Sequence, residues 1–367
     1  MLSKFELYAK DIIYGRKKGI IPFLFKCLLL PVSWVFRSVV VVRNRLYDKG
    51  WMRCYIPPVP LVISIGNIVA GGTGKTPVTL LLAKTFYGRH SLAVLSRGYR
   101  SKVENLESPV ILCEGNGPLF PASYCGDEPY IYANRFPKSI VVVGGNRKNA
   151  AKMAAKEGAQ VILLDDALQH RRIARDFDII VIDVGDPFGQ GYFLPRGFLR
   201  EDISSLSRAD LIILNHIMDQ QQFKDVKNLL IRYTQAPVVG TSGHVSAILD
   251  LTGKNIGSLQ GRKVGMFCAI AHPEYFRRTL ENMGAVIVTE LSLADHDIIK
   301  EKALEHFAFQ SVQKEAEYLV CTEKDRVKLK DDCKLPLPIV WIQMELTIVE
   351  GQSEWQDFLS MAETKIY

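Results

Sequence analysis

The stretch Ala70-Gly71-Gly72-Thr73-Gly74-Lys75-Thr76-Pro77 decides the fold of this chain. It follows an apolar run at residues 61–65 that is typical of a strand, and it opens a helical stretch at residues 77–87. Glycines let the backbone N–H groups of such a loop face a phosphate, while Lys75 neutralises phosphate oxygens and Thr76 offers a hydroxyl to Mg²⁺. The sequence therefore predicts a nucleotide-binding phosphate loop, or P-loop, formed by residues 71–76.

The loop departs from the commonest phosphate-loop pattern at its start. The usual G-x-x-x-x-G-K-T would place a glycine at position 69, where this chain has Val69. The loop instead resembles a variant with paired glycines, which often begins with a lysine; Ala70 occupies that place here. A glycine-rich turn without a nucleotide is the alternative, and the strand–loop–helix context favours the phosphate loop.

Short apolar runs alternate with helical stretches from about residue 59 onward. Continuous apolar strands separated by helices are typical of a parallel sheet covered on both faces. We therefore expect an α/β fold with a P-loop NTPase-type parallel sheet and a second, smaller α/β domain. The expected divisions are a P-loop domain at 56–216, a linker at 217–240, the smaller domain at 241–350 and a C-terminal helix at 351–367.

The N-terminal residues 1–55 carry the positive charge of the chain. They hold eleven basic and three acidic residues, a net of +8, and the residues between these charges are strongly apolar and include Trp34. Only ten residues separate Lys26 from Arg37, whereas a membrane-spanning helix needs about 20. We expect an amphipathic, membrane-docking helical segment that lies in the interface of an anionic membrane. An amphipathic helix packed on the protein's own core is the alternative, and nucleic acid is not an expected partner.

Two carboxylates follow an apolar run at residues 161–164. These are Asp165 and Asp166, and His170 lies shortly after them. Downstream of a phosphate loop, a strand that ends in carboxylates is where an aspartate that organises Mg²⁺ is expected. Because ligands bind at the carboxyl ends of parallel strands, all three side chains are expected to line the site.

Two further pairs of polar residues are candidates for the site. Arg200 has the chemistry to clamp phosphate oxygens and Glu201 to reach a metal or its waters, although without a fold context the two form an ordinary surface pair. Asp127 and Glu128 lie in a loop rich in turn residues. A kinase needs a carboxylate that accepts the proton of the attacking hydroxyl, and Asp127 is a candidate for it; an ordinary turn aspartate is the alternative.

Together these elements resemble the tetraacyldisaccharide 4′-kinase family of lipid A biosynthesis. The resemblance covers nearly the whole chain, and two departures stand out. The family's Asp-Asp-Gly-Phe-Gln-His has Ala167 and Leu168 here, and Asp297 follows His296 where the family often has a second His. The matching stretches are Arg43-Asn44 with Tyr47, Ser64–Asn67 with Gly71–Pro77, Ser96–Tyr99, Gly126–Glu128, Gly144–Arg147, Leu164–Asp166 with Gln169-His170, Leu194-Pro195 with Leu199–Glu201, Asp295-His296 and Thr322–Asp325.

The resemblance implies an enzyme that uses ATP and Mg²⁺. Its reaction would transfer the γ-phosphoryl group to the 4′-hydroxyl of a tetraacylated disaccharide 1-phosphate, a lipid A precursor. The resemblance also implies a peripheral protein on the cytoplasmic face of the bacterial inner membrane, with two α/β domains that close on the nucleotide. We expect this enzyme to be a monomer.

The resemblance further implies roles for individual residues. The family's Asp–His pair, which activates the hydroxyl, matches Asp127 and His296. These two residues and Lys75 are expected to be catalytic. The remaining assignments are site arginines at Arg147 and Arg200, a nucleotide contact at Tyr99, metal-side groups at Thr76, Asp166 and Glu201, and further site candidates at Asp165, His170 and Glu128.

Two other functions fit parts of the sequence. A switch-type or metallochaperone P-loop NTPase uses hydrolysis to change partners and is usually a dimer; Ala70 in place of lysine and the lipid-facing segment count against it. A membrane scaffold that binds ATP without turnover would not need Asp127, Arg200 and Glu201 together.

Overall fold

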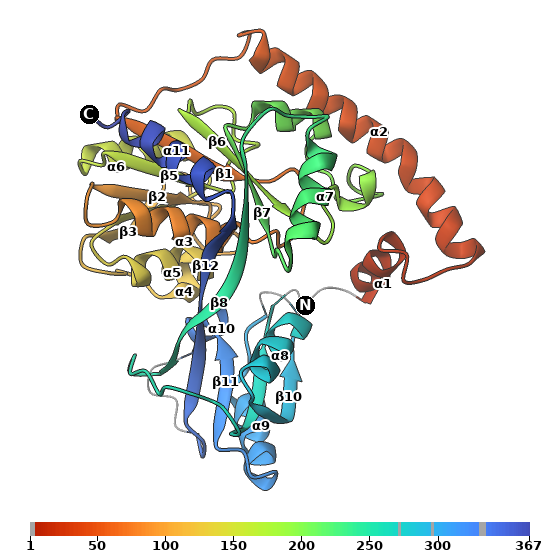
Figure 1. Cartoon of the computed structure of the whole chain (residues 1–367), viewed down its shortest axis with the longest axis vertical. Helices are drawn as coiled ribbons and strands as arrows, with labels where there is room; N and C mark the ends of the chain where they lie inside the picture. The colour runs from red at the N-terminus through yellow and green to blue at the C-terminus, as the bar shows by residue number, and fades with distance from the viewer. Residues whose placement is uncertain (1–3, 271–272, 295–296, 330–334) are drawn as a thin grey trace. The chain divides into compact units, whose positions relative to one another are not determined.

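The fold comes from a computed structural model that describes residues 4–270, 273–294, 297–329 and 335–367. The chain divides into two compact units (Figure 1). The larger unit contains the residues up to Gly243 together with Leu346–Tyr367, and the smaller one contains His244–Glu345. Two strands, β8 (Val238–Asp250) and β12 (Ile339–Glu350), contribute residues to both units.

The larger unit is built on a mostly parallel sheet, as the sequence predicts. Its strands lie in the order β7-β6-β1-β5-β2-β4-β3, and only β3 runs antiparallel to its neighbour. Strand β8 continues this order beside β7. Most of these strands are buried along their whole length, because helices cover both faces. The bounds are β1 Leu61–Gly66, β2 Leu92–Ser96, β3 Val110–Glu114, β4 Ile140–Val143, β5 Val161–Asp165, β6 Phe177–Asp183 and β7 Leu211–Asn215.

Alternate residues of the strands divide the core of this unit into two faces. Helices α3 (Lys75–Phe86), α5 (Asp127–Arg135) and α11 (Gln352–Glu363) pack on one face, against side chains such as Ile63 and Val181. Helices α6 (Arg147–Lys156) and α7 (Gln220–Leu230) pack on the other face. A short helix, α4 (Ala122–Cys125), and the 3₁₀ turns Gly189–Gly191 and Ile203–Arg208 complete the unit.

The expected linker at residues 217–240 is not a linker in the structure. It contains α7 and the start of β8, and it lies within the larger unit. The reason is a buried stripe on α7, in which Phe223, Val226 and Leu230 recur at helical spacing and pack into the core. The polar glutamines at the start of α7 concealed this stripe in the sequence.

The smaller unit is a second parallel α/β arrangement with strand order β10-β9-β11-β12. One core cluster joins Val264 and Met266 of β9 to α8, and another joins Phe267 to α9, so helices cover both faces of these strands. The bounds are β9 Lys263–Cys268, α8 Pro273–Asn282, β10 Val286–Ser292, α9 Glu301–Gln313, β11 Tyr318–Thr322 and α10 Glu323–Arg326.

The N-terminal segment forms α1 (Lys4–Ile13) and a long helix, α2 (Ile20–Asp48) (Figure 1). Helix α2 runs without a break through Pro31, and only Ser33, Val40 and Asn44 of its residues are buried. In the described part of the chain it is the one helix long and apolar enough to cross a membrane, judged by length and composition alone. The charges that interrupt the apolar run therefore do not interrupt the helix.

Candidate functional site

The predicted phosphate loop connects β1 to α3. Gly71 and Gly74 have φ of 127° and 83°, and a side chain at Gly74 would collide with the amide of Asn215. That amide donates to the Thr73 carbonyl oxygen over 3.2 Å, and the Asn67 amide donates to the Thr73 hydroxyl over 2.7 Å. Because α3 begins at Lys75, the N–H groups of its first turn are available to a phosphate.

Lys75, Asp166 and Arg200 come together from three separate segments beside this loop. The Arg200 guanidinium donates to both oxygens of Asp166 over 2.7 and 3.1 Å, and the Lys75 ammonium lies 3.7 Å from the same carboxylate. Burial would raise the pKa of Asp166, yet Lys75 and Arg200 hold it well below its usual range. Arg200 also donates to the side-chain oxygen of Asn67. The structure thus brings together the cations and the carboxylate that the sequence assigns to phosphate chemistry.

Asp165 lies buried next to Asp166 at the end of β5. Burial, followed by the negative charges of Glu128 and Asp166, raises the pKa of Asp165 to about 7. The Ser96 hydroxyl donates to its carboxylate over 3.1 Å. Arg147, which is 4% exposed, donates to the Asp165 carbonyl oxygen over 2.7 Å, and burial lowers its pKa to about 10. Asp165 and Arg147 are therefore buried together at the end of β5, and Glu128 is close enough for its charge to act on Asp165.

His170 is part of the same surroundings and is neutral near pH 7. Burial, with the positive charges of Arg147 and Arg97, lowers its pKa to about 4. A neutral imidazole at this position adds no further positive charge beside Arg147.

The low pKa of His170 predicts a pH-dependent stability. Below pH of about 6.5 the unfolded chain takes up a proton at this residue, whereas the folded chain does so only near pH 4. The free energy of unfolding should thus fall as the pH decreases through this window, by about 2 kcal/mol between pH 8 and pH 5 from this residue. Urea unfolding of the wild type and of His170→Gln at pH 8 and pH 5 measures this change. The free energy of unfolding should fall less in His170→Gln than in the wild type. His306→Gln, at an exposed position of α9, is the control and should behave as the wild type.

Asp127 and Tyr99 occupy the borders of this region. Asp127 is the first residue of α5 and directly follows Gly126, whose φ is 100°. Tyr99 is 54% exposed, and the Arg100 guanidinium lies 5.3 Å from the centre of its ring. His296 falls outside the described residues, so the Asp127–His296 pair stays a prediction.

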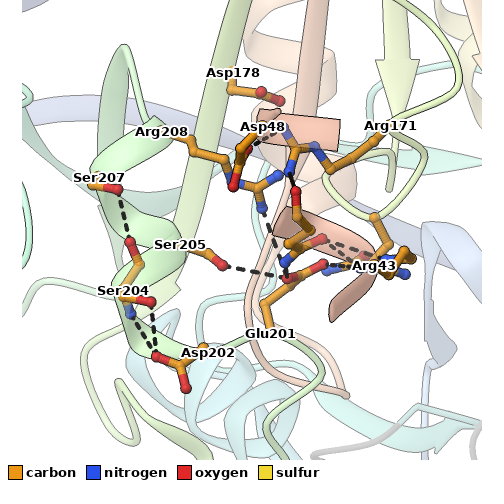
Figure 2. A network of polar contacts seen from close by, with 12 residues as sticks. Arg43, Asp48, Arg171, Asp178, Glu201, Asp202, Ser204, Ser205, Ser207 and Arg208 are labelled. Carbon is orange, nitrogen blue, oxygen red and sulfur yellow. Dashed lines mark hydrogen bonds and ion pairs between the residues drawn. The ribbon is translucent and has the colours of Figure 1, made fainter. Parts of the chain in front are cut away.

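Glu201 lies in a different environment from its neighbour Arg200. Its carboxylate is fully buried, and it accepts from Arg43 over 2.6 Å and from Asn44 over 2.5 Å. The Ser205 hydroxyl also donates to this carboxylate over 3.3 Å, and the Arg208 guanidinium lies 3.8 Å from it (Figure 2). In the described part of the chain, the hydrogen bonds and ion pairs of this carboxylate go to Arg43, Asn44, Ser205 and Arg208. In that part of the chain, no group of three or more His, Cys, Asp or Glu side chains could hold a metal ion. The structure therefore does not bring Glu201 together with the other expected metal-side groups.

Three contributors to the site were missed from the sequence. Asn67 and Asn215 follow or end buried strands, and both hold Thr73 of the phosphate loop. Tyr132 is fully buried in α5, and burial, followed by the charges of Asp165 and Glu128, raises its pKa well above the usual value. A polar residue at the carboxyl end of an apolar strand is a signal that could have identified both asparagines.

Comparison with known proteins agrees with this geometry. Residues 25–363 match the family model described as tetraacyldisaccharide-1-P 4′-kinase. The tetraacyldisaccharide 4′-kinase of Syntrophotalea carbinolica is 35% identical, over 96% of this chain and 97% of that protein. The enzyme of the same name from Halothermothrix orenii is 34% identical, over 91% of each chain.

A solved structure extends the agreement to three dimensions. The crystal structure of LpxK from Aquifex aeolicus in complex with ATP matches with a TM-score of 0.75 and 26% sequence identity. The match covers 94% of this chain and 99% of that one. The predicted fold and the predicted resemblance are both confirmed, and the chain belongs to the tetraacyldisaccharide 4′-kinase family.

Proposed function

We propose that this chain transfers the γ-phosphoryl group of ATP to the 4′-hydroxyl of a tetraacyldisaccharide 1-phosphate. The observation that carries the proposal is the cluster of Lys75, Asp166 and Arg200 beside a phosphate loop, in a chain of this kinase family. Phosphoryl transfer depends mainly on positioning and on stabilising negative charge, and this cluster supplies two cations at the loop.

The loop and its cations would hold the nucleotide. Backbone N–H groups of residues 71–76 would face the phosphates, and Lys75 and Arg200 would bind their oxygens. Thr76 and Asp166 are the residues that would hold Mg²⁺, since a hydroxyl and one carboxylate, completed by phosphate oxygens and waters, fit its preference for oxygen ligands. Bound there, Mg²⁺ would neutralise charge that develops on the phosphate oxygens.

Asp127 would accept the proton of the attacking hydroxyl, with His296 as its partner. The position of α5 supports this role. Glu128, which follows Asp127 in the chain, lies close enough to Asp165 for its charge to raise the pKa of Asp165. The first turn of α5 is thus near the phosphate site. Tyr99, exposed after the turn at Gly98, is available to contact the nucleotide, and buried Arg147 would hold the end of β5 in place.

Helix α2 would dock the enzyme on the membrane that contains its acylated substrate. Its apolar side chains are unusually accessible: Leu28, Trp34 and Val35 are 71, 60 and 66% exposed. Basic residues lie along and before the helix, as expected for an anionic surface. We infer a peripheral enzyme on the cytoplasmic face of the bacterial inner membrane.

Reversing the basic cluster Arg16-Lys17-Lys18 should weaken membrane binding. All three side chains are exposed, and each basic residue near an anionic surface contributes about 1 kcal/mol. Changing the three to Glu should therefore markedly reduce co-sedimentation with anionic vesicles. Reversal of Lys254, Lys302 and Lys314, which are exposed on the smaller unit, is the matched control and should have little effect. Equal binding of both triple variants would contradict docking through this cluster.

One assay tests the proposed function against the alternatives. The full-length protein is incubated with γ-labelled ATP, Mg²⁺ and the lipid precursor in detergent micelles. Label in the lipid supports the kinase, label in free phosphate alone supports a switch-type NTPase, and no turnover supports a scaffold.

A further inference from the structure

A narrow stripe along α2, which includes Ser33, Arg37 and Asn44, contacts residues 193–202. Ser33 donates to the Phe193 carbonyl oxygen over 2.9 Å, Arg37 pairs with Asp202 over 3.0 Å, and Asn44 donates to Glu201 over 2.5 Å. The rest of the helix is largely exposed. Residues 193–202 therefore form one surface on which this helix rests.

Asn44 and Glu201 form the most buried contact of this stripe. Glu201 is 0% exposed and Asn44 is 8% exposed. Arg43 lies against both, with one nitrogen 2.6 Å from the carboxylate and 3.1 Å from the Asn44 side-chain oxygen. A buried carboxylate needs such partners, because an unpaired one would be strongly destabilising. The partners around it also fix the direction of its side chain (Figure 2).

Glu201 is joined through the backbone to the phosphate site. The N–H groups of Arg200 and Glu201 both donate to the Ile68 carbonyl oxygen, over 2.8 and 3.3 Å, so this short segment is attached to the chain just before the phosphate loop. From there the side chain of Arg200 extends to Asp166 and Asn67. Two neighbouring residues thus have different partners: the side chain of Glu201 contacts α2, and the side chain of Arg200 contacts the phosphate site.

A second connection joins the loop that carries Asp166 to the end of α2, close to Asn44. Arg171 lies five positions after Asp166, and its guanidinium donates to the Asn44 carbonyl oxygen over 3.0 Å and to Asp48 over 2.6 Å (Figure 2). The end of α2 therefore contacts both loops that carry the pair.

We infer that Asn44 and Glu201 are a positioning pair that holds Arg200 toward the phosphate site, and so makes phosphoryl transfer depend on the seating of the lipid-facing helix. This inference rests on the proposed function. It assigns Glu201 to positioning through its contacts with α2, in place of the metal-side role implied by the family resemblance.

Exchanging the two side chains tests the pair. Asn44→Asp places two carboxylates face to face, and Glu201→Gln places two amides face to face. The double variant Asn44→Asp/Glu201→Gln restores one amide and one carboxylate, with Arg43 beside both. Each single variant should lower kcat on the order of 10- to 100-fold, as expected when a group that binds the transferring phosphate is displaced. The double variant should recover most of this loss.

Three further measurements separate positioning from other roles. Binding of a fluorescent ATP analogue should weaken far less than kcat falls, because the loop and Lys75 are intact and only Arg200 is displaced. The Mg²⁺ concentration that gives half-maximal activity should be unchanged in Glu201→Gln. Asp225→Asn, at an exposed position of α7, is the matched control for a neutralised carboxylate and should keep the wild-type kcat. Thermal unfolding verifies that each variant is folded.

Two results would overturn the inference. One is a wild-type kcat in both single variants; the other is a folded double variant without recovery, together with a raised Mg²⁺ requirement in Glu201→Gln, as a metal ligand would give. Label transfer by the wild type in the same series tests the proposed function separately.

Discussion

Lys75→Ala should lower kcat on the order of 10²- to 10³-fold, because one fixed positive charge beside the transferring phosphate is lost. The Lys75 ammonium lies 3.7 Å from Asp166, at the first position of α3, where the helix N-terminus and the loop meet. Part of the loss should also appear in ATP binding, since the same charge acts on the ground-state phosphates. Steady-state kinetics with saturating lipid and varied ATP separates the two effects.

Lys84→Ala is the matched control for this experiment. Lys84 is exposed near the end of the same helix, so its removal changes the same residue type without touching the loop. It should keep near-normal kcat. Near-normal turnover in Lys75→Ala would contradict the assignment of residues 71–76 as the phosphate loop of a kinase.

Asp127→Ala and His296→Ala should each lower kcat by about 10²- to 10⁴-fold, the usual contribution of a positioned general base. If the two act as one unit, the double variant should be little worse than the poorer single variant. ATP binding should change little, because neither residue belongs to the phosphate loop. The kcat values of the two single variants and the double variant measure this directly.

Asp225→Ala, at an exposed position of α7, provides the control for loss of a carboxylate and should keep the wild-type kcat. Losses that multiply fully in the double variant would show that the two residues act independently. A His296→Ala variant with unchanged kcat would leave Asp127 to act without this partner.

The sequence was sufficient to predict the parts of the fold that depend on local patterns. Buried strands such as β1 and β5 are continuous apolar runs, and glycines beside Lys75 between a strand and a helix are typical of a phosphate loop. Asp166 could be predicted as a candidate site residue because it directly follows such a strand. Local patterns of this kind need only neighbouring residues, so they can be read without a structure.

The environment of Glu201 could not be predicted in the same way. Its partners Arg43 and Asn44 lie 158 and 157 positions earlier in the chain, and a charged residue beside Arg200 gives no sign of being fully buried. The packing of α7 was missed for a related reason, since three glutamines at its start resemble a linker while the buried stripe comes later. Which distant segment covers a residue is decided by the whole fold.

The interrupted larger unit has a consequence for synthesis on the ribosome. Trp355, Phe358 and Ala362 of α11 belong to the same core cluster as α3, and the ring of Phe358 lies 5.3 Å from that of Phe177. The smaller unit, His244–Glu345, is continuous and is completely synthesised before these residues. The nascent chain must therefore hold an unfinished nucleotide-binding core until α11 is synthesised, while α2, which precedes every strand of the sheet in the chain, is already available to the membrane.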